Sequence, residues 1–162
     1  MTYDHEHQDD ILITSGGADE YRPMWVVEGD ETLSTKHSGG ICVENGASFR
    51  ITSSGQHSGS LTFRPGSAGT IVGQHSGSLE VHPETDVVVE GAQSGSVHVS
   101  AGATLKVAAS GRLAGSLHVE GTIENRGQRG GCEHISGGQV LDIDGGTVKQ
   151  PALRNGAKYY EW

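Results

Sequence analysis

Three histidines at nearly regular intervals are the residues of this chain whose type and spacing could do chemistry. His37, His57 and His75 lie 20 and 18 residues apart, and each is followed by serine and glycine. Three imidazoles on neighbouring strands could chelate a metal ion such as zinc. A strand spacing of about 4.8 Å suits tetrahedral coordination poorly, and no carboxylate shares the column. The favoured interpretation is a stacked histidine ladder, which would gain charge near pH 6 and weaken the fold in acid.

Other histidines align in two further columns. Their immediate neighbours are apolar, so strand alternation predicts that both columns face solvent and form ordinary surface. One column holds Cys42, Thr62, Glu80, His98 and His118, and the other holds Glu44, Arg64, His82 and Glu120. The segment from Asp4 to His7 has an HxH spacing that could bind a metal weakly, but at a chain end we interpret it as incidental.

No catalytic constellation is present in the sequence. The chain contains no GxSxG elbow, no P-loop and no HExxH motif. Its serines recur as members of a repeat, whereas a nucleophile needs one serine that differs from the rest. We therefore expect a protein that is not an enzyme and that uses no cofactor or resident metal.

The histidine motif belongs to a repeat that organises the whole chain. The segments Gln56–Leu61 and Gln74–Leu79 share the sequence QHSGSL, and Gln93–Val97 follows with QSGSV. Their central glycines are 18 residues apart, and looser copies at Gly39 and Gly115 are offset by 20. A period this short indicates one small unit stacked on itself.

Each repeat carries two pairs of apolar residues, with spacing two inside each pair. Spacing two is the period of a β-strand with alternate side chains facing inward. Glycines between the two pairs predict tight turns or close backbone approach. The apolar positions are Ile41, Val43, Phe49 and Ile51, then Leu61, Phe63, Gly69 and Ile71, then Leu79, Val81, Val87 and Val89, then Val97, Val99, Leu105 and Val107, with Leu117, Val119 and Ile123 opening a fifth unit. The turn glycines are Gly46, Gly66, Gly102 and Gly121.

These observations predict an all-β fold, a single-stranded parallel β-helix (solenoid) of about five to six coils with 18–20 residues each. Apolar residues at every sixth position, as in hexapeptide acyltransferases, are absent. Residues 34–125 instead resemble the bactofilin group of bacterial cytoskeletal proteins in period and residue type. The resemblance implies a compact triangular β-helix. We expect an acidic capping or first-coil segment over residues 1–33, the β-helix over 34–150, and an aromatic tail over 151–162, in one structural domain.

Charge and aromatic residues concentrate at the two ends. Residues 1–31 hold nine acids and the single base Arg22. This segment therefore carries a formal charge of −8, out of −9 for the whole chain. Such a segment can bind a basic partner, or it can simply keep the chain soluble. The last four residues include three of the chain's eight aromatics, which could cap the solenoid or anchor a protein contact. The residues we expect to contact a partner are Asp19, Glu20, Glu28, Asp30, Glu31, Tyr159, Tyr160 and Trp162.

The remaining composition limits location and partners. Cys42 and Cys132 are far apart, and neither lies in a CxxC motif, which is typical of free thiols in a reducing compartment. No signal peptide and no long apolar run occurs, so we expect a cytoplasmic protein that does not bind membranes. An acidic chain without a basic face also argues against nucleic acid as a ligand.

Two functions from different classes fit these features. The first is a protein-binding module that is similar in overall character to the immunity proteins of bacterial toxin–immunity pairs. Such a module would neutralise a toxin, for example a basic nuclease, through an acidic surface. The second is a bactofilin-like cytoskeletal polymer in which β-helices self-associate end to end. An acidic segment covering one end would oppose the second. Filaments in electron microscopy would favour the polymer, and a discrete monomer or dimer would favour the binding module.

Overall fold

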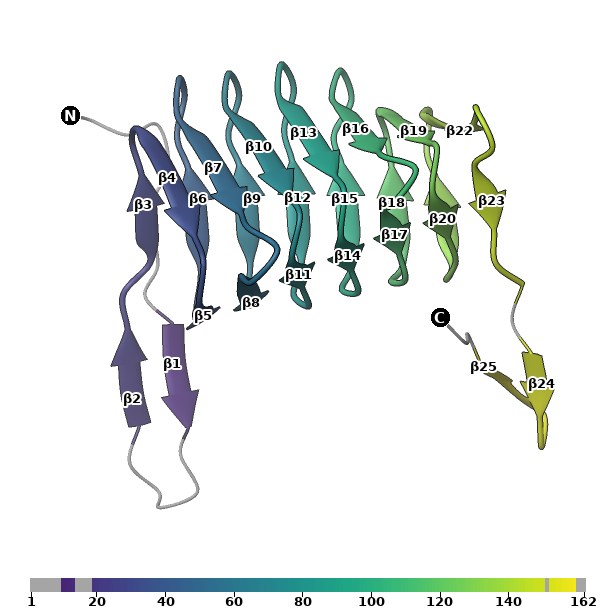
Figure 1. The fold of residues 1–162 in the computed structure, drawn as a ribbon, viewed down its shortest axis with the longest axis horizontal. Helices are drawn as coiled ribbons and strands as arrows, with labels where there is room; N and C mark the ends of the chain where they lie inside the picture. The colour runs from purple at the N-terminus through teal and green to yellow at the C-terminus, as the bar shows by residue number, and fades with distance from the viewer. Residues whose placement is uncertain (1–9, 14–18, 151, 160–162) are drawn as a thin grey trace.

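A computed structural model describes residues 10–13, 19–150 and 152–159 of the chain. Every regular element in these residues is a β-strand, and three parallel sheets of seven strands each run the length of a rod (Figure 1). The chain visits the three sheets in turn, so each circuit adds one strand to each sheet. The predicted β-solenoid is confirmed.

Each sheet contains one strand from every coil. The first sheet comprises β3 (Trp25–Val27), β6 (Ile41–Val43), β9 (Leu61–Phe63), β12 (Leu79–Val81), β15 (Val97–Val99), β18 (Leu117–Val119) and β21 (Glu133–Ile135). The second comprises β4 (Asp30–Leu33), β7 (Ser48–Ile51), β10 (Ala68–Ile71), β13 (Asp86–Val89), β16 (Thr104–Val107), β19 (Thr122–Asn125) and β22 (Gln139–Asp142). The third comprises β5 (Lys36–Ser38), β8 (Gln56–Ser58), β11 (Gln74–His75), β14 (Ala92–Gln93), β17 (Arg112–Leu113), β20 (Gln128–Arg129) and β23 (Thr147–Val148).

The solenoid has about seven coils, which is more than the five to six expected. The first coil lacks the Ser-Gly-Ser repeat motif. In the last coil, exposed polar residues alternate with few apolar ones, so the repeat is hard to recognise in the sequence at both ends. Hydrogen bonding nevertheless continues in register, with Trp25 opposite Ile41 and Ile135 opposite Val119. Backbone pairing therefore extends further than the sequence echo.

The predicted apolar columns fill the interior of the rod. Parallel pairing sets Leu79 between Leu61 and Val97, and it sets Val89 between Ile71 and Val107. All six side chains are fully buried. Most strands of the first two sheets thus bury two residues against the strands above and below, which compensates for the low apolar content of the sequence.

Glycines close the turns between the first and second sheets. Gly46, Gly66 and Gly102 adopt positive φ angles of 78°, 82° and 82°, as the sequence predicts for tight turns. Gly121 is constrained differently, because a Cβ there would collide with the backbone carbonyls of Ser100 and Ala103. The two roles predicted for these glycines, a tight turn and a close backbone approach, are therefore both found at these corners.

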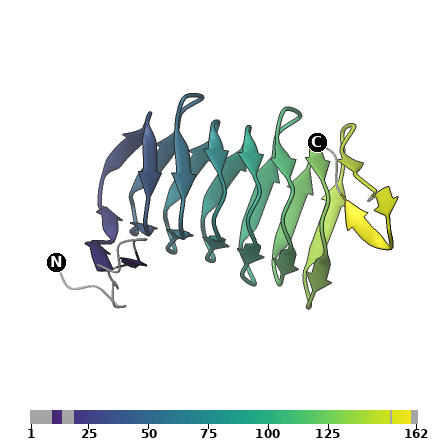
Figure 2. The ribbon, with the colours of Figure 1, turned by 90° about the horizontal axis from the view of Figure 1, so that it is seen from below.

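Two antiparallel hairpins flank the rod. The first pairs β1 (Asp10–Ile13) with β2 (Asp19–Arg22), and the second pairs β24 (Ala152–Arg154) with β25 (Ala157–Tyr159). In Figure 1 both lie below the rod, on the side of the third sheet, at opposite ends. The view from below shows the rod with the N-terminal and C-terminal segments at its two extremities (Figure 2).

Candidate functional site

The histidine ladder lies inside the solenoid. His57 and His75 are 2% and 1% exposed, and their rings stack with centroids 4.9 Å apart and 7° between planes. His37 continues the stack at 5.4 Å from His57 but is only half-buried. The predicted stacking is confirmed, and the ladder contributes to the core rather than to the outer wall.

Each buried member of this column holds a carbonyl of the preceding coil. His57 Nε2 lies 2.6 Å from the carbonyl oxygen of Gly39, and His75 Nε2 lies 3.0 Å from that of Gly59. Gln93 takes over one coil later, because its Nε2 donates to the carbonyl of Gly77 at 2.9 Å. Histidine and glutamine are interchangeable here because both reach a turn carbonyl that would otherwise be buried without a donor.

Burial favours the neutral form of His75, the last histidine of the ladder. Loss of solvent lowers the pKa of His75 below its usual value near 6.5, although hydrogen bonds with the Gln93 side chain and the Gly59 carbonyl act in the opposite direction. His75 Nδ1 also contacts Gln93 Oε1. Among the described residues, no group of three or more histidine, cysteine, aspartate or glutamate side chains is placed to hold a metal ion.

The glycines of the echo stack at one corner of the rod. A Cβ on Gly77 would meet the backbone of Gly59, and a Cβ on Gly95 would meet that of Gly77. The coils could not approach each other at this corner with any larger residue. Packing therefore explains the motif (His/Gln)-Ser-Gly-Ser. Its first residue hydrogen-bonds a glycine carbonyl of the preceding coil, and its glycine allows the two coils to approach each other at the corner.

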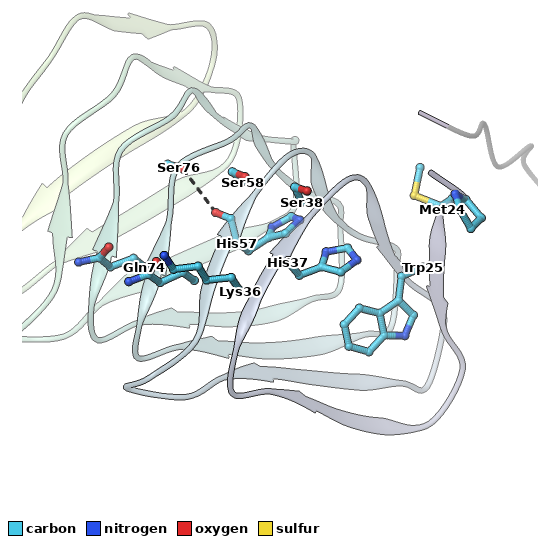
Figure 3. A pocket seen from close by; sticks show the side chains of 11 residues that line it. Met24, Trp25, Lys36, His37, Ser38, His57, Ser58, Gln74 and Ser76 are labelled. Atoms are coloured by element: carbon cyan, nitrogen blue, oxygen red, sulfur yellow. Dashed lines mark hydrogen bonds between the residues drawn. The ribbon is translucent and has the colours of Figure 1, made fainter. Parts of the chain in front are cut away.

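An open hollow of about 710 Å³ borders the N-terminal coils on the third sheet (Figure 3). The entering chain forms part of it with Met24 and Trp25, and Lys36 is the only charged residue in its lining. Outward-facing glutamine and serine side chains of successive coils line the rest: Ser38, Gln56, Ser58, Gln74 and Ser76. The lining is thus polar on one side and apolar on the other.

Trp25 closes the N-terminal end of the core. Its indole packs edge-on against His37 and Phe49, with ring centroids 5.3 Å apart in both cases. The indole N–H donates to Glu31 Oε2 at 2.8 Å. Val27 and Leu33, which point inward from the same first coil, are 0% and 5% exposed. This end of the rod is covered.

The acidic residues chosen from the sequence lie on two parts of the described chain, the first coil and the N-terminal hairpin. Glu28, Asp30 and Glu31 are exposed on the first coil, and Asp30 accepts a hydrogen bond from Ser48 Oγ at 2.5 Å. Asp19 and Glu20 belong to β2 of the N-terminal hairpin. Of the aromatic tail, Tyr159 ends β25, whereas Tyr160 and Trp162 lie outside the described residues, as does the Asp4–His7 motif.

The outer histidine column extends one coil further than predicted. His98, His118 and His134 are exposed, and the last two stack at 4.9 Å. His98 Nε2 lies 3.1 Å from Glu120 Oε1. His134 was missed because the sequence spacing changes after Gly127, although Glu133–Ile135 repeats the strand pattern of Leu117–Val119.

Two members of the outer columns were predicted wrongly. Cys42 and Glu44 are 4% and 7% exposed, whereas the columns were expected to face solvent. Both follow the first coil, and Cys42 Sγ lies 3.5 Å from Glu44 Oε1. Strand alternation sets the direction of a side chain, but neighbouring segments decide whether solvent reaches it.

A polar network that the sequence analysis missed lies beneath the last coil. Arg129 occupies the ladder column, is 8% exposed, and donates to both oxygens of Asp142 at 2.8 and 2.7 Å. Arg129 also contacts Glu133, and Asn125, which is fully buried, donates to Asp142 at 2.8 Å. Hydrogen bonds from Arg129 lower the pKa of Asp142 below its usual value, although burial opposes them. The alignment could have revealed the network, since Arg129 follows Leu113 in the column.

The C-terminal end differs from the N-terminal one. Ile135 and Val148 occupy inward columns but are 49% and 41% exposed. They and Leu141 are the exposed large hydrophobic side chains of the described residues. The core is therefore open to solvent at the last coil.

Comparison with protein-family models, curated proteins and solved structures finds no match to this chain. The described residues contain no helix that is long and apolar enough to cross a membrane. The class of protein is thus defined by fold alone: a parallel β-solenoid of about seven coils.

Proposed function

We propose that this protein is a non-enzymatic binding module that neutralises a basic protein partner, as the immunity protein of a bacterial toxin–immunity pair. The observation that carries this proposal is the uncompensated acidity of the first coil. Asp30 and Glu31 hydrogen-bond to the uncharged side chains of Ser48 and Trp25. Elsewhere on the rod, several acids pair with bases, as Asp86 does with Lys106 at 3.6 Å.

The acidic first coil and the hollow lie at the same end of the rod. Trp25 joins them, since it lines the hollow and bonds Glu31. A negative patch raises the association rate of a basic partner and favours the correct orientation. The hollow beside it would then accept an anchoring side chain of that partner.

The test has two stages. The chain is first used as bait in its source cells to identify a stoichiometric basic partner, and that partner is then expressed alone and with this protein in a growth assay. We expect co-expression to restore growth. Reversing the first-coil charges (Glu28→Lys, Asp30→Lys and Glu31→Lys together) should weaken the complex by about a hundredfold, because several like charges then face the partner.

A matched control variant distinguishes the effect of the first-coil acids from the effect of the protein's net charge. Glu80→Lys, Asp86→Lys and Glu90→Lys make the same change of charge in the middle of the rod. Loss of neutralisation in the first variant only would support the proposal. Equal loss in both variants, or no basic partner at stoichiometric ratio, would contradict it.

A bactofilin-like polymer is the second candidate, and exposed Ile135 and Val148 favour it. A filament of stacked solenoids requires two open ends that fit each other. The buried Val27 and Leu33 and the acidic residues of the first coil oppose such a contact at the N-terminal end. The binding module is therefore preferred.

A further inference from the structure

The last coil presents the core of the solenoid to solvent. Ile135 continues the column of Val119, and Val148 continues that of Arg129. The exposed fraction rises along these columns from 1% to 49% and from 8% to 41%. Side chains placed to pack under another coil therefore have no coil above them.

Backbone edges surround these apolar side chains. Among the described strands, the C-terminal strand of each long sheet (β21, β22 or β23) has a hydrogen-bonded neighbour on one side only. Unpaired strand edges around an apolar centre form a template for further pairing. Figure 1 shows that β24 and β25 lie below the rod, not across the face of the last coil.

The acids of the last coil are paired with arginines of the coil below it. Arg129 pairs with Asp142 and Glu133, and Arg126 pairs with Asp144 at 3.0 Å. Two such ends can approach each other without bringing uncompensated like charges together. The first coils are less suited to such a contact, because each carries the exposed Asp30 and Glu31, which hydrogen-bond to the uncharged Ser48 and Trp25 side chains.

We propose that the C-terminal coil binds the C-terminal coil of a second copy, so that two rods form a closed two-fold dimer. The contact is isologous, because the covered N-terminal end offers no partner for head-to-tail stacking. A two-fold axis perpendicular to the rods reverses the chain direction, so strand edges meet antiparallel across the junction. Ile135 and Val148 of each copy then pack against the other copy. This inference is independent of toxin neutralisation, which uses the opposite end.

Sedimentation equilibrium over a range of concentrations tests the dimer. We expect twice the monomer mass for the wild type, and Ile135→Glu should raise the dimer dissociation constant by about a hundredfold, because a carboxylate would be desolvated at the junction. Val88→Glu on β13 and Val26→Glu on β3 are matched controls at half-buried outward positions, and both should leave the dimer intact. Circular dichroism confirms that each variant keeps its fold.

Spin labels establish which ends meet. In a Cys132→Ser background, which removes the exposed thiol, labels at Gln139 should lie within about 25 Å of each other. Labels at Thr32 should lie roughly 60 Å apart or more, since each rod stacks about seven strands at about 4.8 Å. A wild-type monomer at all concentrations, a filament, close Thr32 labels, or a dimer insensitive to Ile135→Glu would each overturn the proposal.

Discussion

At the scale of single residues, the most constrained position is the buried imidazole of His75. It stacks on His57 on one side and meets Gln93 on the other, in a column where a later coil places the aliphatic Leu113. Its ring nitrogens face the Gly59 carbonyl and the Gln93 side chain. A neutral ring has one N–H and can donate to only one of these acceptors, but a charged ring would lose its hydration in the core.

Acid should therefore destabilise the protein through His75. Its pKa in the folded state is lowered relative to about 6.5 in the unfolded chain, so the unfolded state binds the proton more readily. The contribution to the free energy of unfolding is complete above pH 6.5, falls as the pH drops below 6.5, and levels off below the lowered pKa. At pH 5.5 the loss from this group is at most about 1.4 kcal/mol.

Urea unfolding at pH 7.5 and 5.5 measures this effect. His75→Gln places the residue of the next coil in the column, keeps a donor for Gly59, and removes the titration. We expect the pH-dependent loss to shrink in this variant, while His118→Gln on the exposed column should change it little. An unchanged pH dependence in His75→Gln would show that other groups are responsible.

At the scale of elements, the corner glycines set how closely successive strands of the third and first sheets can stack. Gly77→Ala would place a methyl group against the carbonyl of Gly59, so the coils would have to separate and neighbouring hydrogen bonds would lengthen. We expect a loss of about 3 kcal/mol or more, measured by urea unfolding. Gly29→Ala is the control, because a Cβ there meets no atom within 4 Å. Similar losses in both variants would refute the stacking explanation.

The elements also show how far the sequence could predict the fold. The columns through Leu79 and Val89 were predictable because each coil repeats the same apolar spacing, and stacking requires that repetition. The buried Arg129–Asp142 pair breaks the rule of apolar inward residues, so a search for apolar columns passes over it. Cys42 escaped for another reason, since its burial depends on segments outside its own repeat.

The proposed contact residues were harder to predict than the fold. Net charge located an acidic N-terminal segment, but only the three-dimensional arrangement places Glu28, Asp30 and Glu31 on the first coil and Asp19 and Glu20 on a separate hairpin. The open C-terminal end was equally hidden. Ile135 has the spacing of an ordinary core residue, and its exposure follows from its place in the last of the described coils.

At the scale of the whole molecule, stability should be the sum of similar coils, each in contact only with its neighbours. Deleting residues 74–91 removes one complete coil, comprising β11, β12 and β13. The remaining columns would then rejoin with like against like: His57 would stack on Gln93, and Leu61 on Val97. We expect this shorter chain to fold into a rod of the same circular dichroism per residue, with an m-value in urea lower by roughly a tenth.

Deleting half a coil is the informative comparison. Removal of residues 74–82 would join Gly73 to Pro83, so Val88, Val89 and Glu90 would take the positions of Leu79, Glu80 and Val81 and bring part of a second-sheet strand into the first sheet. Glu84 would then lie beside His57 in place of His75, and Asp86 would take the corner position of Gly77, where the stacked glycines leave no room for a side chain. This variant should be unfolded or aggregated, while the full-coil deletion unfolds in one cooperative transition. If both deletions behaved alike, the coil could not be the unit that stabilises this protein.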